Sequence, residues 1–275
     1  MKIKKGNVAV ITGGGGGIGR CMARALAAKG CDLALVDIDQ SALNESLSVI
    51  AEFDVNCSLH IADVTQYHAV ESLVSEVLEK HGKVNILINN AGITIQKSFA
   101  THSLEDWQRV LGINFMGVIH GCKAFLPSLI SAAEDEGAHI INMSSMAGFL
   151  GLPNQASYSA TKAAVRMLSE TLHAELKDKS IGVTSVHPGA IKTKMLLATM
   201  HESDDIKTAE KSYKMVEKIG NSPEYAATRI VNAIEKNRLR IRIGKDSVIL
   251  DILKRLFPVS LSKCISTMTA KANAK

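Results

Sequence analysis

The chain has 275 residues, of which 46% are hydrophobic and 21% are charged, and its formal net charge is +5. This composition excludes a chain that is disordered over most of its length, and it suits one large α/β domain. Aromatic residues make up only 4% and basic residues form no long stripe, which disfavours a nucleic-acid partner.

The cysteines and the N-terminus bear on where the protein works. The five cysteines form no CxxC pair and their number is odd, which is typical of reduced thiols in a cytoplasmic protein. The nine histidines lack the spacing of metal ligands. The basic N-terminus is not followed by the apolar region of a signal peptide, and no apolar stretch reaches membrane-spanning length. We therefore expect no metal site and no integral membrane segment.

Strands and helices alternate along the chain. Short apolar runs that end at turn residues predict strands, and apolar residues at helical spacing predict helices. The predicted strands cover 7–12, 32–37, 55–63, 84–92, 139–145, 182–189 and 239–244. The predicted helices cover 17–29, 41–53, 66–81, 103–133 in two pieces, 158–177 and 223–236. This order predicts one α/β domain over residues 1–245, a doubly wound, seven-stranded parallel sheet with helices on both faces.

The stretch TGGGGGIG, residues 12–19, joins the first predicted strand to the first predicted helix. Such a turn binds a pyrophosphate, because glycines let the backbone approach closely and the helix amides point at the anion. Two registers fit the loop. The pattern GxGxxG uses Gly14, Gly16 and Gly19, whereas TGxxxGxG uses Gly13, Gly17 and Gly19. The loop by itself does not decide between them.

Asp37 ends the second predicted strand, twenty positions beyond Gly17. A carboxylate at this place hydrogen-bonds the ribose hydroxyls of a dinucleotide; the alternative is an ordinary strand-end carboxylate. Asp37 would repel a 2′-phosphate, and the one nearby cation, Arg20, lies inside the predicted helix. We therefore expect NAD as the cofactor, with NADP as the alternative.

Tyr158 and Lys162 lie four residues apart in a predicted helix, so they share a face. A cation near a phenol lowers its pKa, which suits Tyr158 to exchange a proton with a carbinol or carbonyl oxygen. Surface pairs with this spacing are common and inert, but small neighbouring residues leave room here for a ligand. Ser145 ends the fifth predicted strand, at the edge where open sheets bind ligands. Ser144 is its rival.

In their order along residues 5–244, these motifs resemble the classical short-chain dehydrogenase/reductase family. The resemblance implies a Rossmann-type fold and selects the loop register of Gly13, Gly17 and Gly19. It also implies a catalytic set made of Asn114, Ser145, Tyr158 and Lys162. The cofactor residues it implies are Gly13, Gly17, Ile18, Gly19, Asp37, Asp63, Val64, Asn90, Gly92, Tyr158, Lys162, Pro188, Gly189, Ile191 and Thr193.

The resemblance further implies a role for each catalytic residue. Tyr158 would be the general acid in reduction and the base in oxidation. Lys162 would lower the pKa of Tyr158 and bind the nicotinamide ribose, and Ser145 would hydrogen-bond the substrate oxygen. Asn114 would hold a water that connects Lys162 to solvent; the alternative is that it caps or kinks its helix. Asn89 is interpreted as a structural hydrogen-bonding residue.

The expected activity is the interconversion of an alcohol and its ketone or aldehyde with NAD. Two alternatives are a non-catalytic NAD(H)-sensing regulator and an NADPH-dependent 3-oxoacyl-carrier reductase. The resemblance also implies a homo-oligomer, a dimer or tetramer that pairs through the helices near 114–133 and 158–177.

The predicted substrate loop covers residues 194–221, and its first part, MLLATM, is apolar. It favours an apolar alcohol or carbonyl substrate, although the same side chains could simply pack a lid helix. Phe149, Leu150 and Leu152 are expected to add apolar surface beside Ser145. His187 and Trp107 are interpreted as packing residues.

Residues 246–275 extend beyond the predicted sheet as a C-terminal helix and tail. Lys254 and Arg255 lie off its apolar stripe. We expect the stripe to pack on the body, on a partner subunit or over the pocket, with peripheral membrane contact as the alternative. The last residues, 266–275, are expected to fray. The stripe consists of Val248, Ile249, Ile252, Leu253, Leu256 and Phe257.

Overall fold

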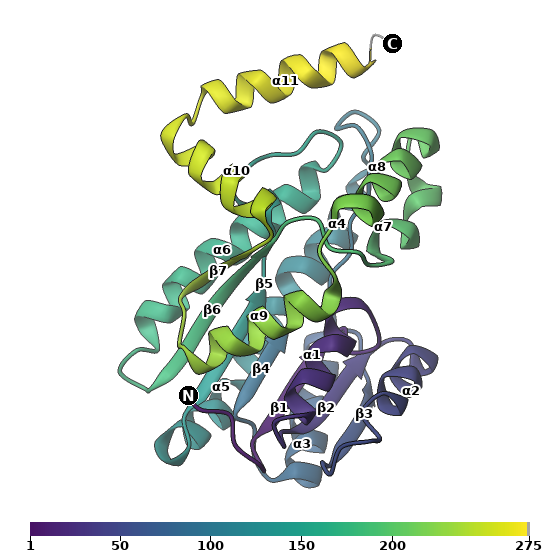
Figure 1. The fold of residues 1–275 in the computed structure, drawn as a ribbon. Coiled ribbons are helices and arrows are strands. Elements are labelled where there is room, and N and C mark those ends of the chain that lie inside the picture. The colour runs from purple at the N-terminus through teal and green to yellow at the C-terminus, as the bar shows by residue number, and fades with distance from the viewer. Residues whose placement is uncertain (274–275) are drawn as a thin grey trace.

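The computed structural model describes residues 1–273, with side chains described through Thr267. This part of the chain forms a single domain around one seven-stranded parallel sheet, with the strand order β3-β2-β1-β4-β5-β6-β7 (Figure 1). The predicted parallel sheet and Rossmann-type fold are therefore confirmed. The strands are β1 Val8–Thr12, β2 Asp32–Asp37, β3 Cys57–Ile61, β4 Ile86–Asn89, β5 Ala138–Met143, β6 Ile181–Pro188 and β7 Arg240–Ile243.

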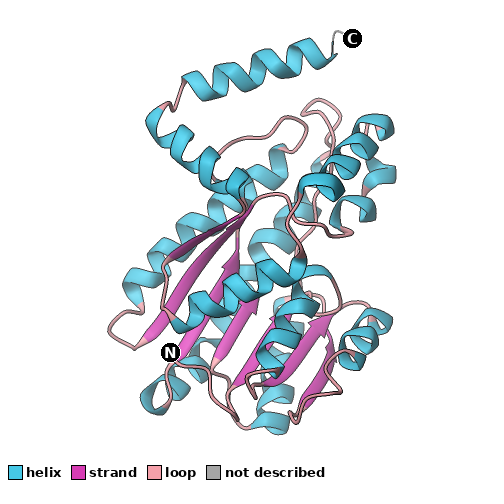
Figure 2. Cartoon of the chain, in the orientation of Figure 1, coloured by secondary structure: helices cyan, strands magenta, loops and turns pink. Residues whose placement is uncertain are grey.

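Helices cover both faces of the sheet (Figure 2). Neighbouring residues of a strand point to opposite faces, so Ala9 and Ile11 of β1 enter one core while Val10 enters the other. Helices α1 and α9 pack on the first face, and α3, α5 and α6 pack on the second. The helices are α1 Gly17–Ala27, α2 Gln40–Ser48, α3 Tyr67–His81, α4 Leu104–Leu111, α5 Gly117–Asp135, α6 Ala156–Glu175, α7 Met195–Ala198, α8 Ile206–Ile219, α9 Pro223–Glu235, α10 Lys245–Leu256 and α11 Ser260–Asn273.

The predicted two-piece helix over 103–133 is one helical path with a π turn in the middle. The turn, Gly112–Met116, joins α4 to α5. The joined stretch Leu104–Asp135 is long and apolar enough to cross a membrane by length and composition, and 44% of its most apolar window is buried in the protein. Phe125 and Leu129 are fully buried in the core on one face of the sheet, so here the stretch serves as a core helix.

The predicted substrate loop and the C-terminus lie at the carboxyl edge of the sheet (Figure 1). The loop folds into α7, a short 3-10 turn at Met200–Glu202 and α8. Helices α10 and α11 extend beyond the sheet (Figure 1). The tail expected to fray from residue 266 is helical through Asn273, and residues 274–275 lie outside the described part of the chain.

The apolar stripe of the C-terminal helix does not pack on the body, which was one of the expected arrangements; packing on a partner subunit stays a prediction. Ile249, Ile252, Leu256 and Phe257 are 53%, 44%, 67% and 54% exposed. Val248 and Leu253, the other two stripe residues, are half-buried. The reason is that α10 buries polar residues on its opposite face, so its apolar stripe faces outward.

Candidate active site

The loop between β1 and α1 has the conformation that the register of Gly13, Gly17 and Gly19 requires. Gly13 and Gly17 have positive φ angles of 64° and 51°, which residues with a side chain rarely adopt. A Cβ on Gly19 would overlap the Gly13 carbonyl oxygen. Because α1 begins at Gly17, the free amides of its first turn lie at this loop.

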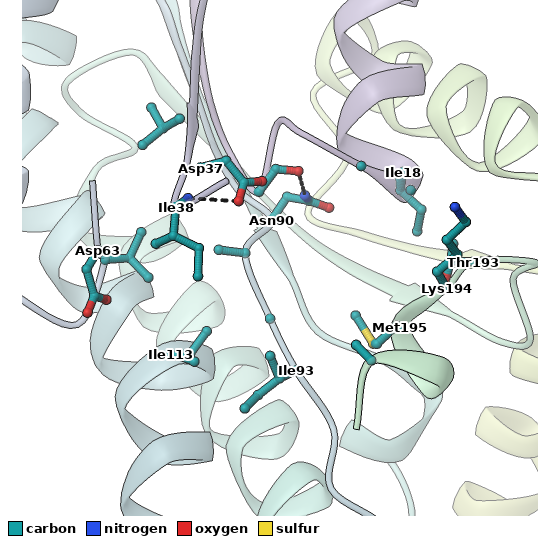
Figure 3. Close-up of a pocket in the computed structure, with 18 of the residues that line it drawn as sticks. Ile18, Asp37, Ile38, Asp63, Asn90, Ile93, Ile113, Thr193, Lys194 and Met195 are labelled. Carbon is teal, nitrogen blue, oxygen red and sulfur yellow. Dashed lines mark hydrogen bonds between the residues drawn. The ribbon is translucent and has the colours of Figure 1, made fainter. Parts of the chain in front are cut away.

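Asp37, at the end of β2, lies beside this loop. Its Oδ2 accepts a hydrogen bond from Gly15 N at 3.0 Å, and its Oδ1 accepts one from Ile38 N at 2.8 Å. Figure 3 shows Asp37, Ile38 and Asp63 on one side of the cavity, and Thr193 and Lys194 on the other. The negative end of the cavity is therefore separate from its lysine.

Arg20, the cation nearest to the loop in the sequence, is engaged in a structural network. Its guanidinium donates to the Gly15 carbonyl oxygen at 2.6 Å, to Ser46 Oγ at 3.0 Å and to Glu45 Oε2 at 2.7 Å. These contacts tie the loop to α2, and they commit the charge of Arg20 to Glu45.

Two adjoining cavities, of about 360 and 200 Å³, make up the cleft. They share Ile18, Asn90, Thr193 and Met195, so the glycine loop and the tyrosine open into one continuous space. The larger cavity is also lined by Gly13, Gly17, Asp37, Asp63, Val64 and Gly92. The smaller is also lined by Ser145, Tyr158, Lys162, Pro188, Gly189 and Ile191. The cleft thus gathers all the predicted cofactor residues except Gly19, which packs beneath the loop.

The two asparagines at the end of β4 differ in position. Asn90 Nδ2 donates to the carbonyl oxygens of Thr12 and Gly13, both at 3.0 Å, and thereby fixes the base of the loop. Asn89 is buried, and its Nδ2 donates to Asn142 Oδ1 at 2.9 Å. Asn89 therefore joins β4 to β5, in keeping with a structural position, while Asn90 lines the cleft.

Tyr158 and Lys162 of α6 line the smaller cavity together. Lys162 Nζ lies 5.5 Å from the centre of the Tyr158 ring and donates to the Met143 carbonyl oxygen at 2.8 Å. Burial raises the pKa of Tyr158 above its usual value, and a hydrogen bond with Ser145 opposes this shift. Burial also lowers the pKa of Lys162 to about 8.

The expectation that the pKa of Tyr158 is lowered is therefore wrong for this structure. Desolvation of the phenolate outweighs the stabilising influences on it. The phenol is consequently held protonated, which is the form that donates a proton to a carbonyl oxygen.

Ser144 and Ser145 lie side by side after β5 but have different partners. Ser145 Oγ hydrogen-bonds Tyr158 and also accepts from Ala147 N at 3.2 Å. Ser144 Oγ donates to the Lys162 carbonyl oxygen at 2.7 Å. The hydroxyl of Ser144 is thus committed to the backbone of α6, and Ser145 is the serine whose hydroxyl meets the tyrosine.

His187, on β6, does more than pack. Its Nδ1 lies 2.9 Å from the Ser145 carbonyl oxygen and its Nε2 lies 2.8 Å from Ser185 Oγ. Because a carbonyl oxygen only accepts, Nδ1 carries the proton and Nε2 accepts from the serine hydroxyl. The Phe149 ring stacks on the imidazole at 4.2 Å, and burial lowers the pKa of His187 to about 4. A neutral His187 therefore holds the backbone of Ser145.

Asn114 lies in the π turn between α4 and α5 and is fully buried. Its Oδ1 accepts from Ile93 N at 2.8 Å, and its Nδ2 donates to the Ile93 carbonyl oxygen at 2.9 Å. A Cβ on Gly92 would lie 3.2 Å from Asn114 Oδ1 and 3.4 Å from Lys162 Nζ, so Asn114 and Lys162 lie close together. The Asn114 side chain thus clamps the backbone after β4, and its role in holding a water stays a prediction.

The smaller cavity, where the sequence predicts the substrate, is lined only in part by the apolar residues expected there. Leu152, Met195 and Leu196 line the smaller cavity as expected. Phe149 and Leu150 are buried outside the cavity lining, because the Phe149 ring stacks on His187 instead.

Two polar residues of this cavity, Thr94 and Gln155, were not predicted. Thr94 is buried, and its Oγ1 has no hydrogen-bond partner within the described part of the chain. Gln155 lies three residues before Tyr158, so helical spacing could have indicated it. The signal for Thr94 was weaker, because it lies in the irregular segment after β4.

Comparisons with known proteins agree with this geometry. The family model described as short chain dehydrogenase matches residues 7–204. The chain is 34% identical to the SadH protein of Mycobacterium tuberculosis over 274 residues, which are 98% of each chain. It is 36% identical to trans-4-hydroxycyclohexanecarboxylate dehydrogenase of Sinomonas cyclohexanicum, over 68% of this chain and 73% of that protein.

A solved structure gives the same result. A short-chain dehydrogenase/reductase of Burkholderia phymatum, in complex with NAD, superposes with a TM-score of 0.83 at 29% identity, over 93% of this chain and 95% of that one. Fold, motif order and sequence relatives agree along most of the chain. The chain therefore belongs to the classical short-chain dehydrogenase/reductase family, whose members are oxidoreductases.

Proposed function

We propose that this protein is an NAD-dependent oxidoreductase that interconverts an apolar alcohol and its ketone or aldehyde. The observation that carries the proposal is the joined cleft. The phenol of Tyr158, the hydroxyl of Ser145 and the ammonium of Lys162 all open into the space that begins at the glycine loop. A substrate in the smaller cavity would therefore lie between the proton-transfer groups and a dinucleotide.

The residues of the larger cavity fit a dinucleotide. The glycine loop and the first turn of α1 present backbone amides suited to a pyrophosphate. Asp37 lies where its carboxylate would accept hydrogen bonds from ribose hydroxyls. NAD, when bound, supplies or accepts the hydride.

NAD is preferred over NADP on charge. A 2′-phosphate at Asp37 would meet a carboxylate, while Arg20 is already paired with Glu45. The relative of Burkholderia phymatum was crystallised with NAD, which supports the same preference.

The chain's own groups would carry the proton. In reduction, the protonated Tyr158 would donate to the substrate oxygen, and in oxidation it would take the proton back. Ser145 would hydrogen-bond the same oxygen and stabilise its developing charge. Lys162 would hold positive charge near the tyrosine, with its Nζ fixed by the Met143 carbonyl.

The side chains of the smaller cavity favour an apolar substrate. Leu152, Met195, Leu196 and Val216 are among its apolar lining residues. An apolar pocket gains affinity from each methylene that it buries. We therefore expect activity to rise with the length of the substrate's hydrocarbon part.

We also propose a homo-oligomer that pairs through α5, the π turn before it and α6. Met116 and Met167 are 40% and 52% exposed on the π turn and on α6, and pairing would cover them. A cytoplasmic location stays a prediction.

A screen of initial rates tests the proposal. Alcohols and ketones of graded length are measured with NAD(H) and with NADP(H), for the wild type and for Tyr158→Phe. We expect turnover with NAD(H), and a loss of about a thousandfold or more in the variant, while NADH still binds, as judged by its fluorescence. Binding of NADH without turnover of any substrate would favour a regulatory protein, and a strong preference for NADPH would favour a carrier-linked acyl reductase.

A further inference from the structure

Helix α10 buries polar side chains and exposes apolar ones, which is the opposite of a helix that packs on its own domain. Ser247 and Asp251 are buried, while Ile249, Ile252 and Leu256 are 53%, 44% and 67% exposed. The three apolar residues are spaced i, i+3 and i+7, so they form one stripe on the outer face. An apolar face that points away from the body marks an interaction site.

Polar contacts fix this orientation. Ser247 Oγ donates to the His187 carbonyl oxygen at 2.8 Å. Asp251 Oδ2 accepts from Arg242 at 2.8 Å, and its Oδ1 accepts from Arg255 at 2.9 Å. Rolling the helix to bury its apolar stripe would break the bonds of Ser247 to His187 and of Asp251 to Arg242, and separating a buried carboxylate from such a partner is strongly unfavourable. The outward apolar stripe is thus a stable feature of the fold.

The stripe continues into the bend before α11. Phe257 and Val259 are 54% and 62% exposed. Lys254 Nζ donates to the Pro258 carbonyl oxygen and to Ser262 Oγ, both at 2.8 Å, so the bend is held in place. We call residues 245–273 the C-terminal arm. Figure 1 shows the arm rising from the carboxyl end of β7 and projecting beyond the sheet.

The charge that the arm presents to its surroundings is positive. From residue 245 to 273 the sequence has five basic residues and two acidic ones. Both acidic residues are engaged inward: Asp251 is buried with arginines around it, and Asp246 Oδ2 accepts from Ala190 N at 2.6 Å. The solvent therefore meets the positive charges of Lys245 and Lys263 beside an apolar stripe.

We propose that the C-terminal arm docks onto the surface of an anionic lipid bilayer. Apolar side chains flanked by lysine and arginine are the pattern of a helix that lies at a membrane interface. A second copy of the chain fits this surface less well, because a two-fold contact between arms would bring like charges together. The arm leaves the sheet at the carboxyl edge, where the cleft also lies, so docking would bring the cleft near the lipid. The proposal goes beyond the proposed enzymatic function and does not depend on it.

Vesicle sedimentation with the full-length protein tests the proposal. We expect binding to phosphatidylcholine vesicles that contain phosphatidylserine, weaker binding to phosphatidylcholine alone, and a decrease with added salt. Phe257→Glu and Ile252→Glu should each reduce binding about tenfold or more. Leu47→Glu, which introduces the same charge at a site that is 38% exposed on α2, is the matched control and should bind like the wild type.

Three results would overturn the proposal. One is a wild type that does not sediment with the anionic vesicles. Another is equal binding by Phe257→Glu and the wild type. The third is light scattering that shows Phe257→Glu dissociating an oligomer of the wild type, which would assign the stripe to a second copy of the chain.

Discussion

We call the end of the cleft at Asp37 the adenosine end, after the proposed cofactor, and the end at Tyr158 the reactive end. At the adenosine end, one loop amide binds one carboxylate, whereas at the reactive end side chains from three distant elements meet. Gly15 N and Asp37 Oδ2, 3.0 Å apart, both belong to residues 12–37. Ser145, Tyr158 and His187 follow β5 or lie on α6 and β6. The first end is therefore a local structure, and the second exists only when the whole sheet has formed.

The two ends also differ in how far the loss of one hydrogen bond is expected to disturb the neighbouring groups. The reactive end is built on buried polar groups, since Lys162 is 3% exposed and Asn114 and His187 are 0% exposed. In a buried network each hydrogen bond supports the next, so the loss of one partner disturbs the others. The carboxylate at the adenosine end lies partly in solvent, where the loss of one contact has a local effect.

Among the substitutions that compare the two ends of the cleft, the largest expected effect separates two neighbouring serines at the reactive end. Ser145→Ala should reduce kcat by about a hundredfold or more, because the substrate oxygen loses a hydrogen-bond donor. Ser144→Ala should leave kcat nearly unchanged and reduce the free energy of unfolding by about 1 kcal/mol, because only a bond to the Lys162 carbonyl is lost. Steady-state kinetics and chemical denaturation measure the two quantities. If Ser144→Ala reduced kcat and Ser145→Ala reduced only the stability, Ser144 would be the substrate-binding residue.

The sequence was sufficient for the features that local patterns encode. The seven parallel strands follow from apolar runs that end at turn residues. The glycine loop is also recognisable locally, although the family resemblance was needed to select the register of Gly13, Gly17 and Gly19. The Tyr158–Lys162 pair follows from helical spacing. Each of these depends on residues close together in the chain or on one repeated period.

The features that depend on tertiary packing were not predictable in this way. The sequence does not indicate that the ring of His187 contacts the Ser145 backbone, because the two residues are 42 positions apart. The apolar stripe of α10 was expected to pack on the body, on a partner subunit or over the pocket, and the contacts of buried Asp251 with Arg240 and Arg242 of β7 turn it away from the body. The raised pKa of Tyr158 likewise reflects burial, which the spacing of two residues does not reveal.

A smaller effect is expected at the adenosine end. Asp37→Asn keeps an acceptor for Gly15 N but removes the negative charge, so the ratio of kcat/KM for NADP to that for NAD should rise about tenfold. Asp39→Asn is the matched control, because Asp39 caps α2 through Ser41 N and Ala42 N and does not line the cleft. A ratio that stays constant in Asp37→Asn, or that rises equally in Asp39→Asn, would show that this carboxylate does not select the cofactor.

The smallest expected effect on kcat is that of substitutions at His187. These substitutions should also change how the stability of the protein depends on pH. Burial lowers the pKa of His187 from 6.5 to about 4. Between these values the unfolded chain binds a proton that the folded chain does not, so stability falls as the pH falls from 6.5 towards 4. A shift of this size corresponds to about 3 kcal/mol. His139, whose pKa burial lowers to about 3, adds to the same acid sensitivity in every variant.

Two substitutions separate the charge of His187 from its hydrogen bond to Ser145. His187→Asn retains a donor for the Ser145 carbonyl, so it should keep kcat within about threefold. Because asparagine cannot titrate, the free energy of unfolding should decrease on acidification by about 3 kcal/mol less than in the wild type. His187→Leu leaves that carbonyl unpaired, so it should reduce kcat about tenfold as well as stability. Urea unfolding at pH 7.5 and pH 4.5, together with kcat at pH 7.5, provides the readout. Equal values of kcat in the two variants would mean that the imidazole only fills space, because a positioning role requires the donor and not the ring.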